Sequence, residues 1–365
     1  MHELRRLDAP ELRSLVLHGE FAIAQENERE VTEQASRTPK LVSAGNIERT
    51  SYRTTNAMET QPKTTSLNRA PWKRRQSSTS AADIIRAKIF ADLPRLVHGF
   101  STRKGGVSDC YGGRTLNLGL TSDDKKENVL RNRELFAEAL GAVDSSGRQW
   151  PLVQVQQIHS AMVLSVDTAP QQALTGDGVI TGTPGLLLGI KTADCVPILV
   201  VDGKRRAVGA FHAGWRGTAA RVVEKGIGEM RRRFGSKPGD LRAAVGPCIR
   251  SCCYVVGAEV QAEFESQFSY AHELFHEVFN SNSVHFKYPL LFLNQRAPGH
   301  GDAASDLHLD LVAANCRQLQ DAGVDSKHIE IVEGCTACDT KRFFSHRAEF
   351  GKTGRMMAAI GIKPE

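Results

Sequence analysis

Two short stretches, Lys191-Thr-Ala-Asp-Cys-Val-Pro197 and Phe211-His-Ala-Gly-Trp-Arg-Gly217, decide how the fold and function of this chain are interpreted. Each stretch ends an apolar run with residues that can carry chemistry, Asp194 and Cys195 in the first and His212 in the second. A short apolar run predicts a buried strand, and polar residues with a glycine turn predict its end. We therefore expect two strand ends that deliver side chains to one pocket.

The overall composition is typical of a globular protein. Of the 365 residues, 41% are hydrophobic, so the chain can bury a sizeable core. No window reaches the ~18 consecutive apolar residues of a membrane span. The N-terminal residues are partly acidic and show neither a signal-peptide nor a transit-peptide pattern. We expect a soluble, cytoplasmic protein that does not partner a membrane.

The positive charge is concentrated near the N-terminus. The net charge is +6, and residues 36–80 hold nine Lys or Arg against two Asp or Glu, so the remainder is close to neutral. A nearly neutral folded part predicts no specific nucleic-acid partner. Residues 36–80 are also rich in Ser and Thr and poor in aromatics. We therefore expect a mostly disordered extension, residues 1–83, followed by a single catalytic domain, residues 84–365.

Eight cysteines are present, and in a chain of this length without a secretion signal they are expected to be thiols. The pair Cys335-x-x-Cys338 resembles half of a zinc or redox motif. A second Cys-x-x-Cys, or a histidine pair at zinc-finger spacing, is missing from the sequence. We therefore interpret Cys335 and Cys338 as an ordinary pair rather than a zinc knuckle, and leave open whether they are redox-active.

The hydrophobic pattern alternates between strands and helices and predicts an α/β fold. Apolar runs predict strands over 96–100, 152–156, 186–190, 196–201, 207–211 and 241–245, with 163–166 as the hairpin partner of 152–156. Helical spacing predicts helices over 126–140, 218–234, 260–268 and 307–322, the second capped by Thr218.

Three candidate metal ligands each follow an apolar run: His159, Cys195 and His212. Two imidazoles and one thiolate are suited to zinc, and three protein ligands leave the fourth tetrahedral position for water or substrate. The three residues are 36 and 17 positions apart, so no local motif brings them together. The residues alone leave open whether they share a site.

Several motifs, taken together and in order, resemble the YfiH-type laccase-domain family, whose members are now described as purine nucleoside phosphorylases. They are Gln154-x-Gln-x-Ile-His159, Thr192-Ala-Asp-Cys-x-Pro197, His212-Ala-Gly-Trp-Arg-Gly217, Gly246-Pro, Asp310-Leu to Asn315, and Phe343-Phe-Ser-x-Arg347 with Thr353-Gly-Arg. The resemblance covers about residues 90–361. It implies a layered sandwich of mixed β-sheets flanked by helices.

The resemblance also implies an activity and a metal. It implies zinc bound by His159, Cys195 and His212, and phosphate-dependent cleavage of adenosine, inosine, guanosine and S-methyl-5'-thioadenosine with adenosine deaminase activity. Copper is less favoured than zinc as the cofactor. Two departures from the family pattern are Ala348, where a second arginine is usual, and Cys248, where a small residue often follows Gly-Pro.

Phosphorolysis requires a phosphate held close to the anomeric carbon of the ribose, which cations and backbone N–H groups do well. The candidate substrate-binding residues are Arg103, Arg216 and Arg347, together with Asn117, which could instead hold a turn. We assign Asp194 to the catalytic set, where it could orient a ligand histidine or act as a general base; it could also simply cap a turn.

Other functions stay open at this stage. Cys195 could be the nucleophile of a cysteine hydrolase or a cell-wall peptide amidase, with His212 or His159 as its base. A copper polyphenol oxidase is disfavoured because the 12 histidines include no His-x-His pair. A metal-stabilised binding protein without catalysis is a further alternative. The sequence leaves the preferred nucleoside and the oligomeric state undetermined.

Overall fold

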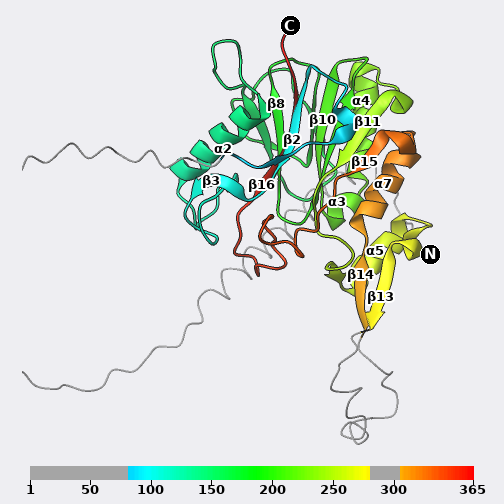
Figure 1. Cartoon of the computed structure of the whole chain (residues 1–365). Coiled ribbons are helices and arrows are strands. Elements are labelled where there is room, and N and C mark those ends of the chain that lie inside the picture. Colours follow the sequence, from blue (N-terminus) through cyan, green and yellow to red (C-terminus); the bar gives the residue numbers. More distant parts are fainter. Residues whose placement is uncertain (1–80, 280–304) are drawn as a thin grey trace, which may run out of the picture. The chain divides into compact units, whose positions relative to one another are not determined.

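The computed structural model of the chain describes residues 81–279 and 305–365 (Figure 1). This part contains two six-stranded sheets and one three-stranded sheet, with helices flanking the larger sheets. Both large sheets mix parallel and antiparallel pairs, so the predicted α/β fold with mixed sheets is confirmed. The extension expected over residues 1–83 lies, apart from its last three residues, outside the described residues.

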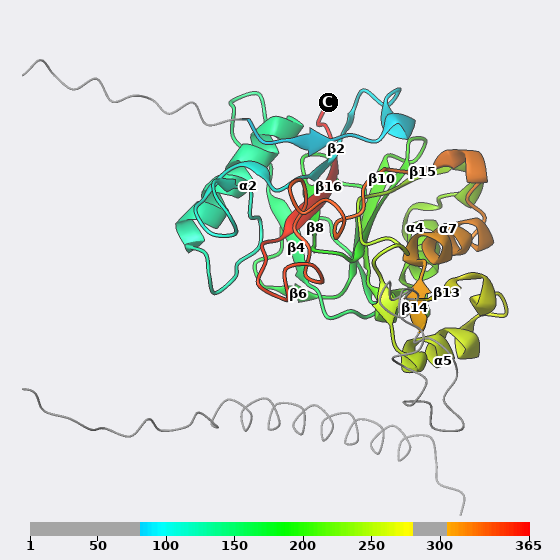
Figure 2. The same cartoon turned by 60° about the horizontal axis from the view of Figure 1, so that its bottom comes forward.

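The first sheet carries helix α2 (Lys126–Leu140) on its outer face (Figure 2). Its strand order is β1 (Ile84–Ile85), β2 (Leu96–Ser101), β16 (Met356–Ile362), β8 (Leu187–Thr192), β4 (Leu152–Gln156) and β6 (Leu174–Thr175). Phe136 and Leu140 of α2 pack on this sheet, and Gly141 ends the helix in the left-handed conformation that the pattern predicts. Strand β3 (Lys104–Ser108) lies beside α2.

The second sheet is covered on its outer face by α3 (Trp215–Ala219), α4 (Val222–Phe234) and α7 (Leu311–Asp321). Its strand order is β15 (Ile329–Ile331), β11 (Leu241–Val245), β9 (Val196–Asp202), β10 (Ala207–Ala213), β7 (Gly178–Thr181) and β5 (Val163–Ser165). Strands β9 and β10 form the antiparallel hairpin that Asp202-Gly203 indicates.

The two large sheets face each other across a shared apolar core, which makes four layers in all. In β9, Leu199 and Val201 point into the core between the sheets, whereas Ile198 and Val200 point toward the outer helices. Strands buried on both faces read as continuous apolar runs, which is why β9 does not alternate in polarity. Burial of each such side chain contributes ~1.5–3 kcal/mol.

A small third sheet lies between β11 and β15 of the second sheet in chain order and consists of β12 (Val255–Val256), β14 (Ser305–Leu309) and β13 (Phe275–Phe279). Helix α5 (Ala258–Gln267) packs beside it through Phe264. Short 3₁₀ turns complete the described elements: η1 (Lys88–Phe90), η2 (Pro238–Asp240), η3 (Ala271–Glu273) and η5 (Ser326–His328). Among the described helices, none is long and apolar enough to cross a bilayer.

Three sequence-based expectations about elements are wrong. The helix expected over 218–234 is two helices, because Arg221 has a φ of 64° that interrupts the helical ladder, and Thr218 therefore lies inside α3 and caps nothing. Strand β5 pairs in parallel with β7 instead of forming a hairpin with β4. The helix expected over 307–322 begins only at Leu311, where the Asp310 side chain accepts a hydrogen bond from Ala313 N.

Candidate active site

A cavity lies where strands β8 and β10 end. Its volume is about 540 Å³, and both of the stretches that open the sequence interpretation reach it. Its lining includes cationic and other polar side chains as well as sulfur and imidazole. The lining residues are Gly119, Leu120, Thr121, Gln156, Gln157, His159, Lys191, Thr192, Ala193, Asp194, Cys195, His212, Ile249, Tyr254, His346, Arg347 and Arg355.

The three candidate metal ligands converge in this cavity. Their ligand atoms all lie within 4.8 Å of one another, and Cys195 Sγ is 3.9 Å from His159 Nε2. The rings of His159 and His212 meet edge to face with centroids 5.0 Å apart. His159 is exposed, whereas His212 is only 3% exposed and lies on the face of β10 that carries Val208 and Ala210 into the inter-sheet core.

A buried carboxylate, Asp177, orients both histidines. Its Oδ1 is 2.8 Å from His212 Nδ1 and accepts the backbone N–H of His159 at 3.0 Å, while Oδ2 accepts the backbone N–H of Ser160 at 2.6 Å. With Nδ1 held by a carboxylate, His212 presents Nε2 to the cavity. The sequence does not single out Asp177, because nothing in Gly176-Asp-Gly178 indicates a distant histidine partner.

The charges of these groups are strongly coupled. Burial alone would raise the pKa of Cys195, but His212 and His159 lower this pKa to about 6. Burial would lower the pKa of His212, yet Cys195 and Asp177 raise it to about 9. Burial opposes ionisation of Asp177, and its hydrogen bonds from His212 and Ser160 hold its pKa at about 2. Without a metal, the site therefore favours a thiolate beside an imidazolium.

Local contacts hold the metal-ligand residues in place. The Gln157 side chain joins the two strands of the first sheet that lead into the cavity, donating from Nε2 to Lys191 O at 2.7 Å and accepting from Lys191 N at 2.9 Å. Gly214, directly after β10, packs against the ligands. A Cβ there would lie 3.0 Å from the ring of His159 and 3.1 Å from Cys195 Sγ. This close packing restricts the positions of the His159 and Cys195 side chains.

Several cations also line the cavity. Lys191, Arg347 and Arg355 line it together with His346, and none of the ion pairs found among the described residues involves them. Burial, with the neighbouring Arg133 and Arg355, lowers the pKa of Lys191. Arg347 was anticipated from the sequence. Lys191 and Arg355 were not, although Lys191 begins the first quoted stretch and Arg355 ends the Thr353-Gly-Arg motif.

Asp194 is not the carboxylate that orients a ligand histidine. Its Oδ1 accepts the Thr336 hydroxyl at 2.6 Å, and its Oδ2 accepts the backbone N–H of Arg347 at 2.7 Å. The residue has a φ of 94°, a costly conformation for a non-glycine residue. Asp194 therefore ties the C-terminal loop to the cavity, while Asp177 is the carboxylate bonded to His212.

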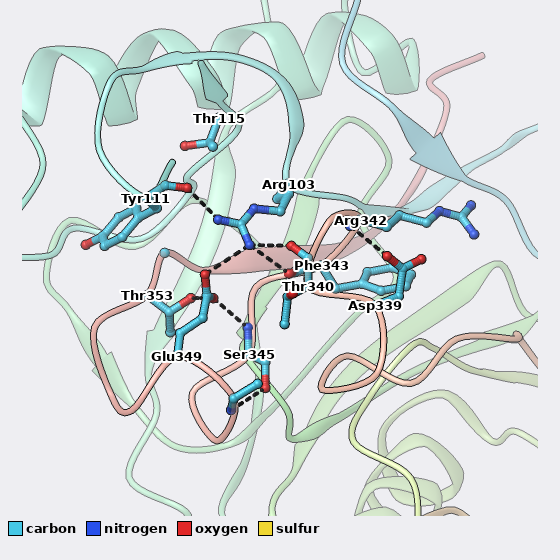
Figure 3. A network of polar contacts seen from close by, with 12 residues as sticks. Arg103, Tyr111, Thr115, Asp339, Thr340, Arg342, Phe343, Ser345, Glu349 and Thr353 are labelled. Atoms are coloured by element: carbon cyan, nitrogen blue, oxygen red, sulfur yellow. Dashed lines mark hydrogen bonds and ion pairs between the residues drawn. The ribbon is translucent and has the colours of Figure 1, made fainter. Parts of the chain in front are cut away.

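Arg103 lies outside the cavity lining and braces the loop that carries Arg347 (Figure 3). Its guanidinium donates to the carbonyls of Tyr111 and Thr340 and pairs with Glu349 at 3.0 Å. Glu349 in turn accepts hydrogen bonds from Ser345 N and the Thr353 hydroxyl. With these internal partners Arg103 supports the fold of the loop, so we do not carry it forward as a phosphate ligand.

Two other sequence candidates also lie outside the cavity lining. Asn117 is fully buried, donates to Gly119 O and to Asp124, and accepts from the backbone N–H groups of Gly119 and Arg355. It therefore holds a turn, the second of the two roles considered for it. Arg216 is exposed, and its guanidinium stacks over the Trp215 ring at 4.4 Å.

Comparison with known sequences identifies the class of protein. Residues 97–363 match the family described as multi-copper polyphenol oxidoreductase laccase, and the chain belongs to this family. The resemblance to YfiH-type proteins is thereby confirmed. The match starts inside β2 and ends just after β16, so it spans nearly all of the two large sheets.

Particular relatives carry more specific names. A purine nucleoside phosphorylase of Deinococcus radiodurans is 36% identical over 272 residues, 73% of this chain and 88% of that protein. Adenosine deaminase RL5, from an unknown prokaryotic organism, is 34% identical over 74% of this chain and 96% of that protein. The crystal structure of the Bacillus licheniformis protein YfiH superimposes with a TM-score of 0.64 at 31% identity, covering 78% of this chain and 97% of that one.

The donor atoms decide which metal chemistry suits the cavity. Two imidazoles and a thiolate fit a single zinc ion and leave one coordination position open. A multi-copper centre requires more histidine ligands than this. Among residues 81–279 and 305–365, only this cluster offers histidines grouped for metal binding, and it offers two. The described residues therefore fit the copper centre implied by the family's description poorly, and fit one zinc ion well.

Proposed function

We propose that this protein is a zinc-dependent purine nucleoside phosphorylase that also deaminates adenosine. The observation that carries the proposal is that a His₂Cys cluster and three cations line one cavity of about 540 Å³. Relatives named for purine nucleoside phosphorylase and adenosine deaminase activity support it. The substrates are adenosine, inosine, guanosine or S-methyl-5'-thioadenosine, with phosphate as the second substrate.

His159, Cys195 and His212 would hold the zinc ion. Bound there, zinc supplies a Lewis acid that polarises substrate oxygen or nitrogen. Asp177 fixes the tautomer of His212 through the 2.8 Å contact to Nδ1 and holds the backbone of His159. In this way one carboxylate sets the orientation of two ligands before substrate binds.

The cations that line the cavity would bind phosphate, the second substrate. Lys191, Arg347 and Arg355 would hold the phosphate dianion, since guanidinium and ammonium donors form strong charge-assisted hydrogen bonds. A phosphate oxygen attacks C1' of the ribose and the C1'–N9 bond breaks. Its electron pair leaves with the purine, which takes up one proton. The products are the free base and ribose 1-phosphate, or its 5-methylthio derivative when S-methyl-5'-thioadenosine is the substrate.

Asp194 serves as a positioning residue in this scheme. Both of its oxygens are engaged, by Thr336 and by the backbone of Arg347, so the carboxylate holds the loop that presents Arg347.

For deamination, water replaces phosphate as the nucleophile and attacks C6 of the purine, and ammonia leaves.

We also propose a cytoplasmic location. All eight cysteines are free thiols, which suits a reducing compartment.

The decisive experiment measures base release from inosine with and without phosphate. Wild-type protein should release hypoxanthine only when phosphate is present and lose this activity on chelation. Cys195→Ala should lose both turnover and the cavity's zinc. Lys191→Met should raise the KM for phosphate with less effect on zinc. Phosphate-dependent turnover by Cys195→Ala that lacks the cavity's zinc would refute the proposal.

A cysteine hydrolase is a second candidate, favoured by the lowered pKa of Cys195 next to His212 and Asp177. The two functions differ in their inhibitors. The hydrolase would survive chelation and be inactivated by iodoacetamide, and it would cleave a cell-wall peptide amide without phosphate. The phosphorylase would be inactivated by chelation and restored by added zinc.

A further inference from the structure

Outside the cavity, four cysteines from two distant segments form a second cluster. Cys252 and Cys253 follow strand β11 by a short loop, and Cys335 and Cys338 follow β15. All four Sγ atoms lie within 4.8 Å of one another. We name this group the four-cysteine cluster. From its geometry, we infer that it binds a structural zinc ion.

The sulfur spacing matches a tetrahedral site. With Zn–S bonds of about 2.3 Å, four sulfurs around one zinc ion lie about 3.8 Å apart. The Sγ of Cys252 is 3.7 Å from those of Cys253 and Cys335 and 3.5 Å from that of Cys338, and the Cys253–Cys338 distance is 3.2 Å. Cys252 thus has three sulfur neighbours at similar distances, which is the arrangement of ligands around one ion and not of two separate disulfide pairs.

Arg250 bonds the two cysteine segments to each other. Its backbone N–H points to Cys335 Sγ at 3.5 Å, a contact that stabilises negative charge on this sulfur. Its guanidinium donates to Gly334 O and Val332 O, just before Cys335 in the chain. Cys252 and Cys338 are exposed, which gives an ion a path to the site.

Four sulfur ligands make this a closed site, in contrast to the His₂Cys cluster. With no position left for water or substrate, a zinc ion here is structural. Soft thiolate ligands also select against magnesium, calcium and manganese. The four-cysteine cluster shares no residue with the cavity, so the inference does not depend on the proposed function.

The cluster's zinc would fix one wall of the cavity. It joins the segment containing Ile249 and Tyr254, which line the cavity, to the segment containing Thr336, whose hydroxyl holds Asp194. Protein contacts already join these segments, among them Thr336 N to Cys248 O at 3.0 Å and the bonds from Arg250 to Gly334 O and Val332 O. A bound ion would add four metal–sulfur bonds to these contacts.

The test is the zinc content of the full-length protein, purified under reducing conditions and measured by elemental analysis. Cys252→Ser and Cys338→Ser should each lose one zinc per chain relative to wild type. Cys110→Ser, which changes a half-buried thiol outside both clusters, should lose none. Cys195→Ala separates the two sites, because it should retain the zinc of the four-cysteine cluster even if its turnover is abolished.

A second measurement needs no variant and covers the case in which serine substitutions prevent folding. Wild-type protein is treated with iodoacetamide before and after zinc chelation, and the modified peptides are mapped by mass spectrometry. Cys252 and Cys338 should be protected before chelation and modified after it. Unchanged zinc content in Cys252→Ser and Cys338→Ser, equal alkylation of wild type with and without chelator, or purified wild type with these cysteines as disulfides and no metal would overturn the inference.

Discussion

At the scale of single residues, the candidate active site depends on how one buried carboxylate is bonded. Asp177 is fully buried, yet every hydrogen bond it accepts comes from the segment or the strand that carries a histidine ligand. A buried charge is costly unless it is paired and fully bonded. The bonds that stabilise Asp177 are therefore the bonds that orient His159 and His212.

Replacing this carboxylate should weaken metal binding. We expect Asp177→Asn to lower zinc affinity of the cavity ~10–100-fold, as is typical when the carboxylate partner of a ligand histidine is lost. Competition with a chromophoric chelator measures this affinity. Asp202→Asn is the matched control, since Asp202 is equally buried but accepts only from the turn residues Lys204 and Arg205. Equal zinc affinities in the two variants would contradict the prediction.

The same residue predicts a pH dependence of stability. The pKa of Asp177 is about 2 in the folded protein, below its ordinary value of 3.8, so the charged form stabilises the fold at neutral pH. This contribution is lost as the pH falls through 3.8 toward 2. Asp177→Asn should therefore be less stable than wild type at pH 7, with a difference that shrinks below pH 4. Thermal unfolding between pH 7 and pH 3 measures it.

Cys195 should be unusually reactive in the metal-free protein. Its pKa of about 6 means that the thiolate is populated well below the ordinary thiol value of 9.0. After chelation, alkylation of Cys195 by iodoacetamide should reach half its maximal rate near pH 6. Cys248 is the internal control, because burial raises its pKa to about 12 and its side chain is inaccessible. A half-maximum near pH 9 for Cys195 would contradict the assigned charge pairing.

At the scale of elements, helix α4 packs closely on the second sheet at a position where the helix carries a glycine. Gly226 faces Phe211 of β10, and a Cβ at Gly226 would lie 2.3 Å from the ring. Gly228, two residues on, is exposed and has nothing within 4 Å of such a Cβ. Because β10 delivers His212, the packing of α4 on Phe211 also supports the site.

The two glycines give a matched pair of substitutions on one helix. Gly226→Ala should destabilise the protein by ~1–3 kcal/mol, because the added methyl overpacks against the buried Phe211. Gly228→Ala should stabilise it by ~1 kcal/mol, because alanine has the higher helix propensity. Urea unfolding measures both free energies. Destabilisation by both substitutions alike would show that the contact with Phe211 is unimportant.

At the scale of the whole molecule, the two large sheets meet at an edge where residues far apart in sequence line one cavity. The first sheet contributes the segments after β4 and β8, the second contributes the end of β10, and the C-terminal loop before β16 adds Arg347. The family match begins only at residue 97, and the first described strand at Ile84. We therefore expect the segment before the first strand to be dispensable for this assembly.

Removing residues 1–80 should leave activity and thermal stability unchanged. The residues that form both clusters and both large sheets all lie after residue 83. Removal of residues 1–101 is the contrasting variant, because it deletes β2, which pairs with β16 over Leu96–Phe100. That variant should fail to fold. A loss of turnover in the shorter deletion would assign a role to the N-terminal segment.

Local chemistry in the sequence determined the class of elements and many of their positions. The continuous apolar runs of β8, β9 and β10 and the helical spacing of α2 are one-dimensional signals, and the structure follows them. The motif around Cys195 and that around His212 also identified the family. The pattern did not predict the helix break at Arg221, which depends on a left-handed backbone conformation. It also did not predict strand β16, because no element was assigned to Met356–Ile362.

Only the tertiary structure decided which polar groups meet. Asp177 reaches His212 across 35 positions, and Cys252 reaches Cys338 across 86, distances at which chain periodicity carries no information. For the same reason the sequence could identify Arg103 as a cation and Asn117 as a hydrogen-bond donor but could not predict their partners. In the structure both residues form hydrogen bonds within the loops that support the cavity. Residue type fixes what a side chain can bind, whereas the packing of the two sheets fixes what lies beside it.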